Sequence, residues 1–433
     1  MIEGDSQELL DEILSGRFVD PATGARFACP VGTLRIGDDL DGAYGDLVGR
    51  LRLGRRLAIV ADPITWEVLG RRVAAAIPDA QPVILRQPRA DGETVEEVRR
   101  AAGRVDALLA VGSGTINDVC KVAAFRDQRR YALFATAPSM NGYLTNVATI
   151  MLRGVPSVMA VRGPCAAFFD LAVLARAPAR LIRAGIGQCL ARSTAQVDCL
   201  LAHHVCGHPY SDTPFDILAE DEGLVLEHAA AAATGDRATV AALVRLLVLA
   251  GLGTVLAGST HPVAMGESLI SHYIDLLASP HPGSLHGEQL AVASWTVARL
   301  QASILARNEP PALGPTWIDE ETMRQRFGPL AEECIKALKR KAIDRTGAEQ
   351  ISTKLAMDWP RLRARLRAAM LPLARMERAM RAAGLPMTAA DFGVPRELYR
   401  NAVRHGRELR DRYGMLDLAA DAGILQEFAD QER

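Results

Sequence analysis

The stretch VGSGTINDVCK, residues 111–121, places two glycines, a serine, a threonine and an asparagine directly after the apolar run DALLA. A buried strand that runs into Gly112, Ser113 and Gly114, followed by a helix from about Thr115, leaves backbone N–H groups directed toward the carboxyl end of the strand. Such groups bind phosphate oxygens with the help of the helix dipole. The spacing is neither the GxGxxG of the dinucleotide fingerprint nor that of a P-loop, so an ordinary tight turn stays open. The stretch predicts a strand–loop–helix unit with a candidate phosphate-binding loop.

Short apolar runs alternate with helical patterns on both sides of this unit. The runs RLAIVAD, QPVILRQ and RYALFATAPS are typical of buried strands, and segments such as TWEVLGRRVAAAI have a helical period. This alternation, from Arg55 to about Asp170, predicts a parallel sheet with helices on both faces. After about Pro178 only helical patterns continue. We therefore expect an α/β dinucleotide-binding domain over residues 1–177 and an all-α domain over residues 178–433.

Length and composition favour a protein that acts on small molecules. At 433 residues the chain exceeds the roughly 250–300 at which one core usually divides. A net charge of −1 argues against nucleic acid as a partner. Seven cysteines without a CxxC pair indicate no disulfide framework, and with the acidic start of the chain they favour the cytoplasm. A homo-oligomer is compatible with these features.

Two helical segments bear on the choice of partners. The longest uncharged apolar run, the 15 residues 246–260, is too short to span a membrane and is expected to form a buried helix. The segment DWPRLRARLRAAM predicts a solvated helix with Asp358 as its N-cap and Pro360 in its first turn. We expect no membrane and no nucleic-acid partner.

Two further segments support a nucleotide site at the same sheet edge. Asp62 ends the run LAIVAD, where a carboxylate accepts hydrogen bonds from an adenosine ribose and repels a 2′-phosphate, which favours NAD over NADP. The alternative role of Asp62 is a helix N-cap. The segment TAPSMNGYLTNVA, residues 136–148, follows the next strand and brings Thr136, Ser139 and Thr145 to this edge. Three loops are expected to converge on one ligand.

These motifs resemble the sn-glycerol-1-phosphate dehydrogenase family, within the superfamily of polyol and iron-containing alcohol dehydrogenases and dehydroquinate synthase. The resemblance runs nearly end to end and is carried by GSGTINDVCK, TAPSMNGYLTNVATIM, ARAPARLIRAGIGQCLA, GSTHPVAMGESLISH, LHGEQLAV and LRDRYGMLDLAADAGIL. It implies a nucleotide-binding domain, a helical domain and substrate between them. By position, it implies that NAD or NADP is held by Gly112, Ser113, Gly114, Thr115, Ile116, Thr136, Ser139 and Thr145.

The resemblance also implies a reaction of phospholipid metabolism, in which dihydroxyacetone phosphate is reduced by hydride transfer while a divalent metal polarises the carbonyl oxygen. Three side chains of the family hold that metal, and two of these positions differ here. Gln188 replaces an Asp and Ser268 replaces a His, so that only His286 remains. An amide and a hydroxyl lack the donor strength of carboxylate and imidazole ligands. We therefore expect no tightly bound divalent ion such as zinc or nickel; a site relocated onto other histidines, with His261 the nearest in sequence, is the alternative.

Without a metal, hydrogen-bond donors must meet the charge that develops on the reacting oxygen. His272 and His286 are the candidate catalytic residues, because a protonated imidazole can donate to an alkoxide. Asn141, which replaces an Asp of the family, Gln188 and His272 are the candidate substrate ligands. We expect an NAD(P)-dependent oxidoreductase of a small polyol phosphate or related hydroxy-ketone. A nucleotide-dependent non-redox enzyme of the dehydroquinate synthase type and an inactive nucleotide-binding homologue stay open.

Overall fold

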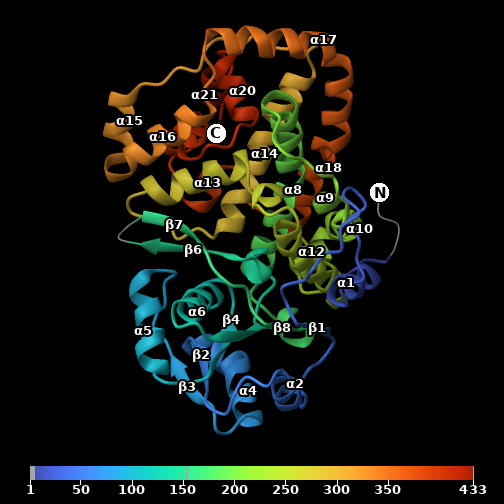
Figure 1. The fold of residues 1–433 in the computed structure, drawn as a ribbon, viewed down its shortest axis with the longest axis vertical. Coiled ribbons are helices and arrows are strands. Elements are labelled where there is room, and N and C mark those ends of the chain that lie inside the picture. The colour runs from blue at the N-terminus through green and yellow to red at the C-terminus, as the bar shows by residue number, and fades with distance from the viewer. Residues whose placement is uncertain (1–4, 153–154, 433) are drawn as a thin grey trace. The chain divides into compact units, whose positions relative to one another are not determined.

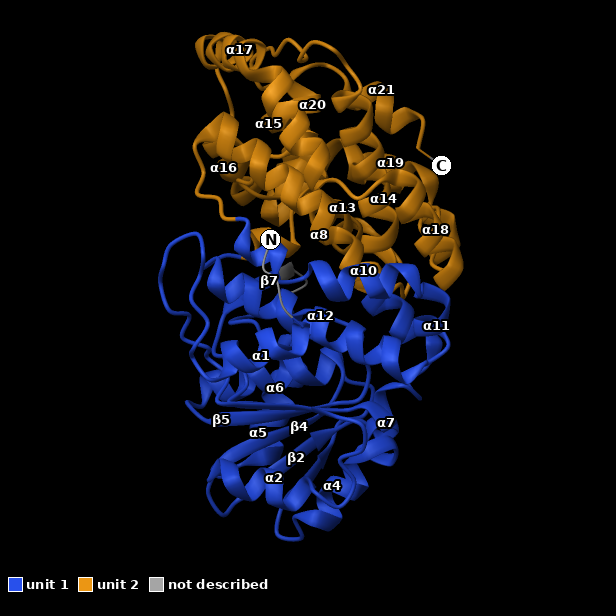
Figure 2. Cartoon of the chain, turned by 90° about the vertical axis from the view of Figure 1, so that its right-hand side faces the viewer, with its two compact units in different colours: residues 1–186, 212–259 blue, residues 187–211, 260–433 orange. Residues whose placement is uncertain are grey.

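The computed structural model describes residues 5–152 and 155–432 (Figure 1). The chain forms two compact units (Figure 2). Unit 1 comprises Met1–Ile186 and Asp212–Ser259, and unit 2 comprises Gly187–Ser211 and Thr260–Arg433. The first division falls within helix α8 (Ala179–Cys206). The compact units are defined by packing, and the expected boundary between functional domains, at residues 177 and 178, stays a prediction.

Unit 1 is built on a parallel sheet of six strands in the order β1-β8-β5-β4-β2-β3. Each neighbouring pair is parallel, and β4 pairs with β5 from Ala107 opposite Arg130 to Gly112 opposite Ala135. The expected parallel sheet is thereby confirmed. The strands are β1 (Thr33–Gly37), β2 (Leu57–Ala61), β3 (Gln81–Ile84), β4 (Ala107–Gly112), β5 (Arg130–Ala135) and β8 (Ala166–Asp170).

The inner strands are continuous apolar runs because helices cover both faces of the sheet. Alternate residues of β4, such as Leu109 and Val111, pack in one cluster with Tyr44 and Val48 of α2 (Tyr44–Leu51). Helix α4 (Arg71–Ala76) lies on the same face and α6 (Gly114–Arg126) on the opposite one, as Figure 2 shows. The edge strand β1 is only half-buried, and for that reason no apolar run indicated it in the sequence.

The remaining elements of unit 1 are short helices and one hairpin. Strands β6 (Val147–Leu152) and β7 (Val155–Ala160) form an antiparallel pair outside the main sheet. The helices are α1 (Ser6–Leu14), α3 (Pro63–Thr65), the π-helical turn η1 (Trp66–Gly70), α4 (Arg71–Ala76), α5 (Gly92–Ala102), α6 (Gly114–Arg126), the 3-10 turn η2 (Gly142–Leu144), α7 (Leu171–Leu174), α9 (Thr213–Asp216), α10 (Ala219–Glu227), α11 (Ala229–Ala233) and α12 (Arg237–Leu256).

Helix α12 contains most of the apolar run that the sequence indicated. It is the one helix of the described residues that is long and apolar enough to cross a membrane, and 78% of its most apolar window is buried inside the structure. Such burial is typical of a core helix. The helix ends at Leu256, earlier than the apolar run at Thr260, and Gly258 then takes a left-handed conformation with φ +62°.

Unit 2 is helical, and its described residues include no strand. The buried residues Val297 and Ile304 of α14 (His286–Leu305) pack in one cluster with Leu355 of α17 (Arg345–Ala369) and Tyr399 of α19 (Arg396–His405). This confirms the expected helical C-terminal region. Besides the end of α8, its helices are η3 (His261–Val263), α13 (Gly266–Leu277), α14 (His286–Leu305), α15 (Glu320–Phe327), η4 (Gly328–Leu330), α16 (Ala331–Lys341), α17 (Arg345–Ala369), α18 (Leu373–Ala383), η5 (Ala389–Phe392), α19 (Arg396–His405), η6 (Gly406–Leu409), α20 (Met415–Asp421) and α21 (Leu425–Asp430).

The prediction that a helix begins at Asp358 is wrong. Helix α17 begins at Arg345, where the side chain of Asp344 accepts a hydrogen bond from the Gly347 amide at 2.7 Å. Pro360 lies inside this helix. The helix continues past Pro360 because the side chains of Leu355 and Trp359 are buried on it. Their packing stabilises the helix by more than the loss of one backbone hydrogen bond at the proline destabilises it.

Candidate functional site

A pocket of about 880 Å³ lies at the carboxyl edge of the parallel sheet in unit 1. Ligands of open α/β sheets bind at this edge. Residues that follow every one of the six strands contribute to its lining, namely Asp39 after β1, Asp62 after β2, Gln87 after β3, Ser113 after β4, Thr136 after β5 and Ala172 after β8. The volume is in the range of small-molecule and cofactor sites.

The glycine loop ends β4 and opens helix α6 at this pocket. Ser113 is the N-cap of α6, and its side chain makes no capping hydrogen bond. The first N–H groups of α6 are therefore left for a ligand, as phosphate oxygens require. A Cβ atom at Gly112 would lie 2.6 Å from Cβ of Ile116, so the loop can close onto the helix only with a glycine here. The strand–loop–helix unit predicted from the sequence is confirmed.

Asp62 caps the helix that follows β2. Its Oδ1 atom accepts hydrogen bonds from the amides of Ile64 at 2.8 Å and Thr65 at 2.9 Å, and the Thr65 hydroxyl accepts one from the Asp62 amide at 3.0 Å. The capping role that the sequence left open is thus present in the structure. Since Oδ2 takes no part in this cap, the same carboxylate can still accept a hydrogen bond from a ligand.

The loop after β5 is fixed by Lys121 of α6. This lysine is fully buried, and its Nζ atom donates to the carbonyl oxygens of Gly142 at 2.8 Å and Val147 at 3.0 Å and to the Thr145 hydroxyl at 3.3 Å. The carboxylate of Asp118 lies 3.7 Å from Nζ. Burial lowers the pKa of Lys121 and raises that of Asp118. The side chain of Thr145, expected to contact nucleotide, is engaged in this internal anchor.

The other nucleotide-binding candidates divide between the pocket and this loop. Ser139 lies in the loop after β5, with its hydroxyl 3.4 Å from that of Tyr143. Asn141 precedes η2 in the same loop, and a Cβ atom at Gly251 of α12 would lie 2.6 Å from its carbonyl oxygen. The candidates that line the pocket are Asp62, Ser113, Thr115, Ile116 and Thr136.

Several pocket residues were not indicated by the sequence. Gln87 and Pro88 follow β3, and the rule that ligands meet the carboxyl ends of parallel strands would have included them. Arg176 follows α7, and Arg237 begins α12, more than 60 residues later in the chain. No local pattern places an arginine from so distant a segment at a sheet edge.

In unit 2, the three positions that hold the family's metal lie on three helices. Gln188 belongs to α8, Ser268 to α13 and His286 to α14. Helices α8 and α14 approach so closely that a Cβ atom at Gly187 would lie 2.1 Å from the carbonyl oxygen of Gly287. Gln188 and His286 therefore flank one contact between helices.

The two candidate catalytic histidines lie side by side. The rings of His272 and His286 are stacked, with centroids 5.7 Å apart and planes at 19°. His286 Nδ1 lies 2.8 Å from the Ser271 hydroxyl. Burial, together with the neighbouring His286, lowers the pKa of His272 to about 3. This shift favours the neutral form of the His272 imidazole, and the proposed role of His272 as a hydrogen-bond donor stays a prediction.

Ser268 is directed toward a buried acid pair. Its hydroxyl donates to Glu267 Oε1 at 3.4 Å, and Glu267 Oε2 accepts a hydrogen bond from the Thr194 hydroxyl at 2.9 Å. Asp198, which is also fully buried, accepts from the amide of Gly266 at 3.2 Å. Burial and the nearby charge of Glu267 raise the pKa of Asp198 to about 7. These hydrogen bonds hold the first turn of α13.

The donor set at the family's metal position does not fit a divalent ion. It consists of one amide, one hydroxyl already bonded to Glu267 and one imidazole, whereas zinc-type sites use three strong protein ligands. Among the described residues, no three His, Cys, Asp or Glu side chains gather as a metal site would require. At His261, the relocated alternative, burial and Arg412 lower the pKa to about 4. The expectation of no tightly bound metal stays a prediction.

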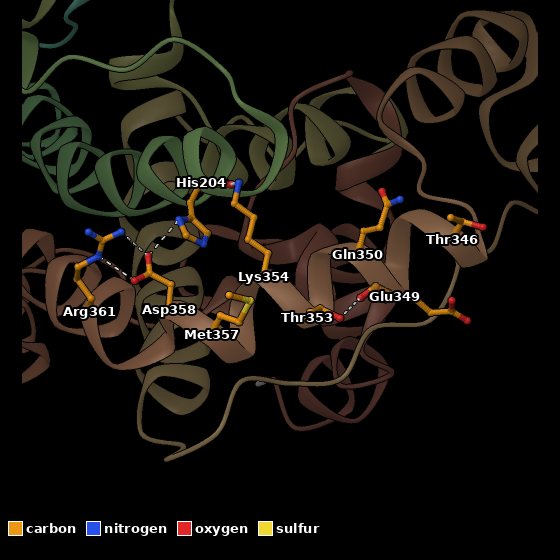
Figure 3. Close-up of a pocket in the computed structure, with 9 residues that line it drawn as sticks. All are labelled: His204, Thr346, Glu349, Gln350, Thr353, Lys354, Met357, Asp358 and Arg361. Carbon is orange, nitrogen blue, oxygen red and sulfur yellow. Dashed lines mark hydrogen bonds and ion pairs between the residues drawn. The ribbon is translucent and has the colours of Figure 1, made fainter.

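A second recess, of about 830 Å³, lies on the outer face of α17 in unit 2 (Figure 3). Apart from His204, its lining residues recur every three or four positions along α17 and form one stripe. Several engage each other: the Asp358 carboxylate accepts hydrogen bonds from Arg361 at 2.8 and 2.9 Å and lies 3.8 Å from His204 Nδ1. Met357 is 83% exposed. None of the predicted site residues lies here.

Comparison with known proteins agrees with the resemblance seen in the sequence. Residues 35–178 match the family model described as iron-containing alcohol dehydrogenase. The glycerol-1-phosphate dehydrogenase [NAD(P)+] of Sulfolobus acidocaldarius is 32% identical over 56% of this chain and 69% of its own length. That of Bacillus velezensis is 25% identical over 85% and 86%. The crystal structure of an iron-containing alcohol dehydrogenase from Thermococcus thioreducens superposes with a TM-score of 0.61 at 13% identity and covers 94% of this chain and all of that one. The chain belongs to the glycerol-1-phosphate dehydrogenase family.

Proposed function

We propose that the protein is an NAD(P)-dependent oxidoreductase that interconverts a small polyol phosphate, or a related hydroxy compound, and its ketone. The observation that carries this proposal is the N-terminus of α6, which lacks a side-chain cap and opens at a pocket lined from all six strands. The names of the relatives, glycerol-1-phosphate dehydrogenases [NAD(P)+], support both the cofactor and the substrate class. Cytoplasmic location, oligomeric state and the absence of nucleic-acid or membrane partners stay predictions.

The dinucleotide is expected to lie along the carboxyl edge of the sheet. Its pyrophosphate would accept hydrogen bonds from the first amides of α6, at Gly114 to Ile116. Asp62 Oδ2 would accept a hydrogen bond from a ribose hydroxyl. The exposed apolar side chains Ile64 and Val68, 75% and 43% exposed, line the same pocket and offer surface that an adenine ring would cover.

Reduction of the ketone requires a hydride donor and a source of one proton. The carbonyl carbon would accept a hydride from the reduced nicotinamide, which would be oxidised, and the carbonyl oxygen would take up a proton from water. In relatives a divalent metal supplies the charge stabilisation for that oxygen, but the donor set at Gln188, Ser268 and His286 does not fit such an ion. We assign the role to hydrogen bonds from His272 or His286, because a neutral imidazole N–H stabilises a developing alkoxide without carrying charge itself. Asn141 and Gln188 are the proposed substrate ligands.

The proposal is tested with purified full-length protein, NADH or NADPH and a panel of hydroxy-ketones that includes dihydroxyacetone phosphate. We expect stoichiometric oxidation of the nicotinamide, unchanged after treatment with a metal chelator. Turnover of substrate without net oxidation would favour the non-redox alternative of the dehydroquinate synthase type. Dinucleotide binding without any turnover would favour the inactive homologue, the reading that the altered positions Gln188 and Ser268 support.

The dinucleotide site itself is tested by calorimetry. Gly114→Val adds a side chain directly at the amides that would hold the pyrophosphate, and a Cβ atom there already comes within 2.8 Å of Met140 Sδ. We expect this variant to lose NADH binding while its thermal unfolding stays close to that of the native protein. Native protein that binds neither NADH nor NADPH would overturn the proposed function.

A further inference from the structure

The charges that line the pocket of unit 1 are not evenly paired. Three acidic and three basic side chains contribute to it, namely Asp39, Asp41, Asp62, Arg72, Arg176 and Arg237. Asp41 lies 3.6 Å from the Arg72 guanidinium, Asp39 accepts a hydrogen bond from the Asp41 amide, and Asp62 caps α3. The guanidinium groups of Arg176 and Arg237 form no ion pair or hydrogen bond with any of the residues that the structure describes.

Close packing of the backbone brings together the two segments that carry these arginines. Gly235 has φ +83°, and a Cβ atom there would lie 2.2 Å from the carbonyl oxygen of Ala175. The turn before α12 therefore rests directly on the residue that precedes Arg176, while Arg237 is only two residues beyond Gly235. No side chain other than hydrogen fits at position 235, so the approach of the two segments is fixed by the sequence.

The neighbouring charges do not balance this pair. The nearest acid in sequence, Asp236, uses Oδ1 to accept hydrogen bonds from the Thr239 amide at 2.9 Å and hydroxyl at 2.7 Å. Arg237 is also the first residue of the 20-residue helix α12, where a cation is electrostatically unfavourable. Two unpaired cations that line the same pocket repel each other, and an anionic ligand bound to both would remove that repulsion.

We propose that Arg176 and Arg237 form a subsite for the 2′-phosphate of NADP(H), so that the protein accepts the 2′-phosphorylated dinucleotide. This inference rests on the proposed function, which places an adenosine in the same pocket and its pyrophosphate at Gly114 to Ile116. With the pyrophosphate held by backbone amides, the third phosphate is the anion that remains for the two guanidinium groups. Guanidinium groups bind phosphate through paired hydrogen bonds and also stack on adenine.

Asp62 does not oppose this assignment as strongly as the sequence suggested. A free carboxylate after β2 repels a 2′-phosphate, and on that ground the sequence favoured NAD. In the structure Oδ1 of Asp62 accepts two amide hydrogen bonds at the start of a helix, which partly neutralise its charge. The carboxylate can accept a hydrogen bond from the 3′-hydroxyl of the ribose while the arginines take the phosphate.

The test compares two probes that differ only in the position of one phosphate, adenosine 2′,5′-bisphosphate and adenosine 5′-diphosphate. Calorimetry is performed on the native full chain, on Arg176→Ala/Arg237→Ala and on the control Arg71→Ala. Arg71 is an exposed arginine of α4, paired with Glu67 at 2.7 Å and outside the pocket lining. We expect the double variant to bind the 2′-phosphorylated probe about tenfold or more weakly, because two charge-assisted contacts are lost. Binding of adenosine 5′-diphosphate should change by less than about twofold, because its phosphates lie at the backbone amides.

Three results would overturn the subsite. Native protein that binds adenosine 5′-diphosphate but not the 2′-phosphorylated probe would show that no such subsite exists. Equal weakening of both probes in the double variant would show that the arginines contact the part that the probes share. Unchanged binding of both probes would place the phosphate elsewhere. Since both arginines are exposed, the variants are expected to unfold at the native temperature, and Arg176→Lys/Arg237→Lys should retain part of the preference. Failure of native protein to bind either probe would instead contradict the proposed function.

Discussion

The Nζ atom of the fully buried Lys121 lies 2.8 Å from the carbonyl oxygen of Gly142 and also donates to Thr145 and Val147. Lys121 belongs to the helix that begins at the glycine loop, and Gly142 to the loop that carries Asn141. One side chain thus connects the loop that the proposed function assigns to substrate with the helix that follows the nucleotide loop. The Tyr143 hydroxyl, which donates to the Ala137 carbonyl oxygen at 2.6 Å, also holds the loop after β5.

Replacing this ammonium group should release the loop. We expect Lys121→Met to destabilise the protein by about 3 kcal/mol or more, because it leaves Asp118 as an unpaired buried charge and the carbonyl oxygens without donors. Denaturant unfolding measures the loss, and hydrogen exchange should show faster exchange at residues 142–147. Arg126→Ala, an exposed arginine of the same helix paired with Glu96 at 2.8 Å, is the control and should change stability little.

A second substitution at Asp118, the ion-pair partner of Lys121, tests whether the unpaired charge or the missing hydrogen-bond donors cause the loss of stability. If the unpaired Asp118 carboxylate causes most of the loss, Asp118→Asn/Lys121→Met should recover part of the stability. A double variant as unstable as Lys121→Met would show that the missing donors to Gly142 and Val147 dominate instead. Native-like exchange of residues 142–147 in Lys121→Met would contradict the anchoring role.

The buried pair Asp198 and Glu267 predicts how stability depends on pH. The pKa of Asp198 is raised from 3.8 to about 7 in the folded chain. Between these values the folded state binds more protons than the unfolded state, so the free energy of unfolding falls as the pH rises from about 4 to about 7. Below about pH 4 both states are protonated and this loss disappears.

Glu267→Gln should reduce this pH dependence. An amide removes the like charge beside Asp198 while its oxygen still accepts from the Met265 amide, now 2.7 Å away, and its NH₂ group can meet the Thr194 hydroxyl. We expect the pKa of Asp198 to fall and the variant to gain stability near neutral pH. Denaturant unfolding across this pH range measures the change. Glu67→Gln, at an exposed glutamate, serves as the control, and an unchanged slope in Glu267→Gln would contradict the coupling.

The sequence predicted the parts of the fold that repeat a simple pattern. Strands such as LAIVA of β2 and ALLAVG of β4 are buried on both faces, so their apolar runs are unbroken and visible. The edge strand β1, TLRIG, is half-buried and has no such signal. The start of α17 was misplaced because Asp358 and Pro360 look like a helix start, whereas burial of Leu355 and Trp359 continues the helix through them.

For the site, the sequence identified the loops but not the use of each side chain. Thr145 has the hydroxyl of a ligand contact, yet its hydrogen bonds go to Lys121 and to nearby carbonyls. Asp62 is a cap as well as a pocket residue. Arg176 and Arg237 come together through the contact of Gly235 with Ala175, a long-range approach that depends on the folded backbone. Such roles are set by packing between distant segments, which local spacing does not encode.

Asn141 should affect substrate more than nucleotide. It stands in the loop that Lys121 anchors, at the position of a family aspartate, and lies outside the lining of the nucleotide pocket. We expect Asn141→Ala to raise the KM for the ketone about tenfold through loss of a hydrogen bond to a polar substrate, with the Kd for NADH unchanged. The backbone contact of Gly251 with the residue 141 carbonyl is retained in this variant. Equal effects on substrate and nucleotide, or no effect on either, would count against the assignment.

The altered metal position predicts what purified protein contains. We expect elemental analysis of native protein to find no stoichiometric zinc, nickel, iron or manganese, because one imidazole, an amide and a hydroxyl do not retain a divalent ion. The reverse change is the stronger test.

Gln188→Asp/Ser268→His would restore the residue types of the family's metal site, because it combines a carboxylate and a second imidazole with His286, on three helices of unit 2. This double variant should bind about one zinc ion per chain, since it supplies three strong ligands. The single variant Gln188→Asp supplies only two strong ligands and should bind zinc weakly. Because Ser268 is only 2% exposed, a thermal melt of the double variant with and without zinc checks that the larger side chain fits, and zinc should raise the melting temperature. Stoichiometric metal in the native protein that is lost in His286→Ala would overturn the prediction and restore a metal-dependent mechanism.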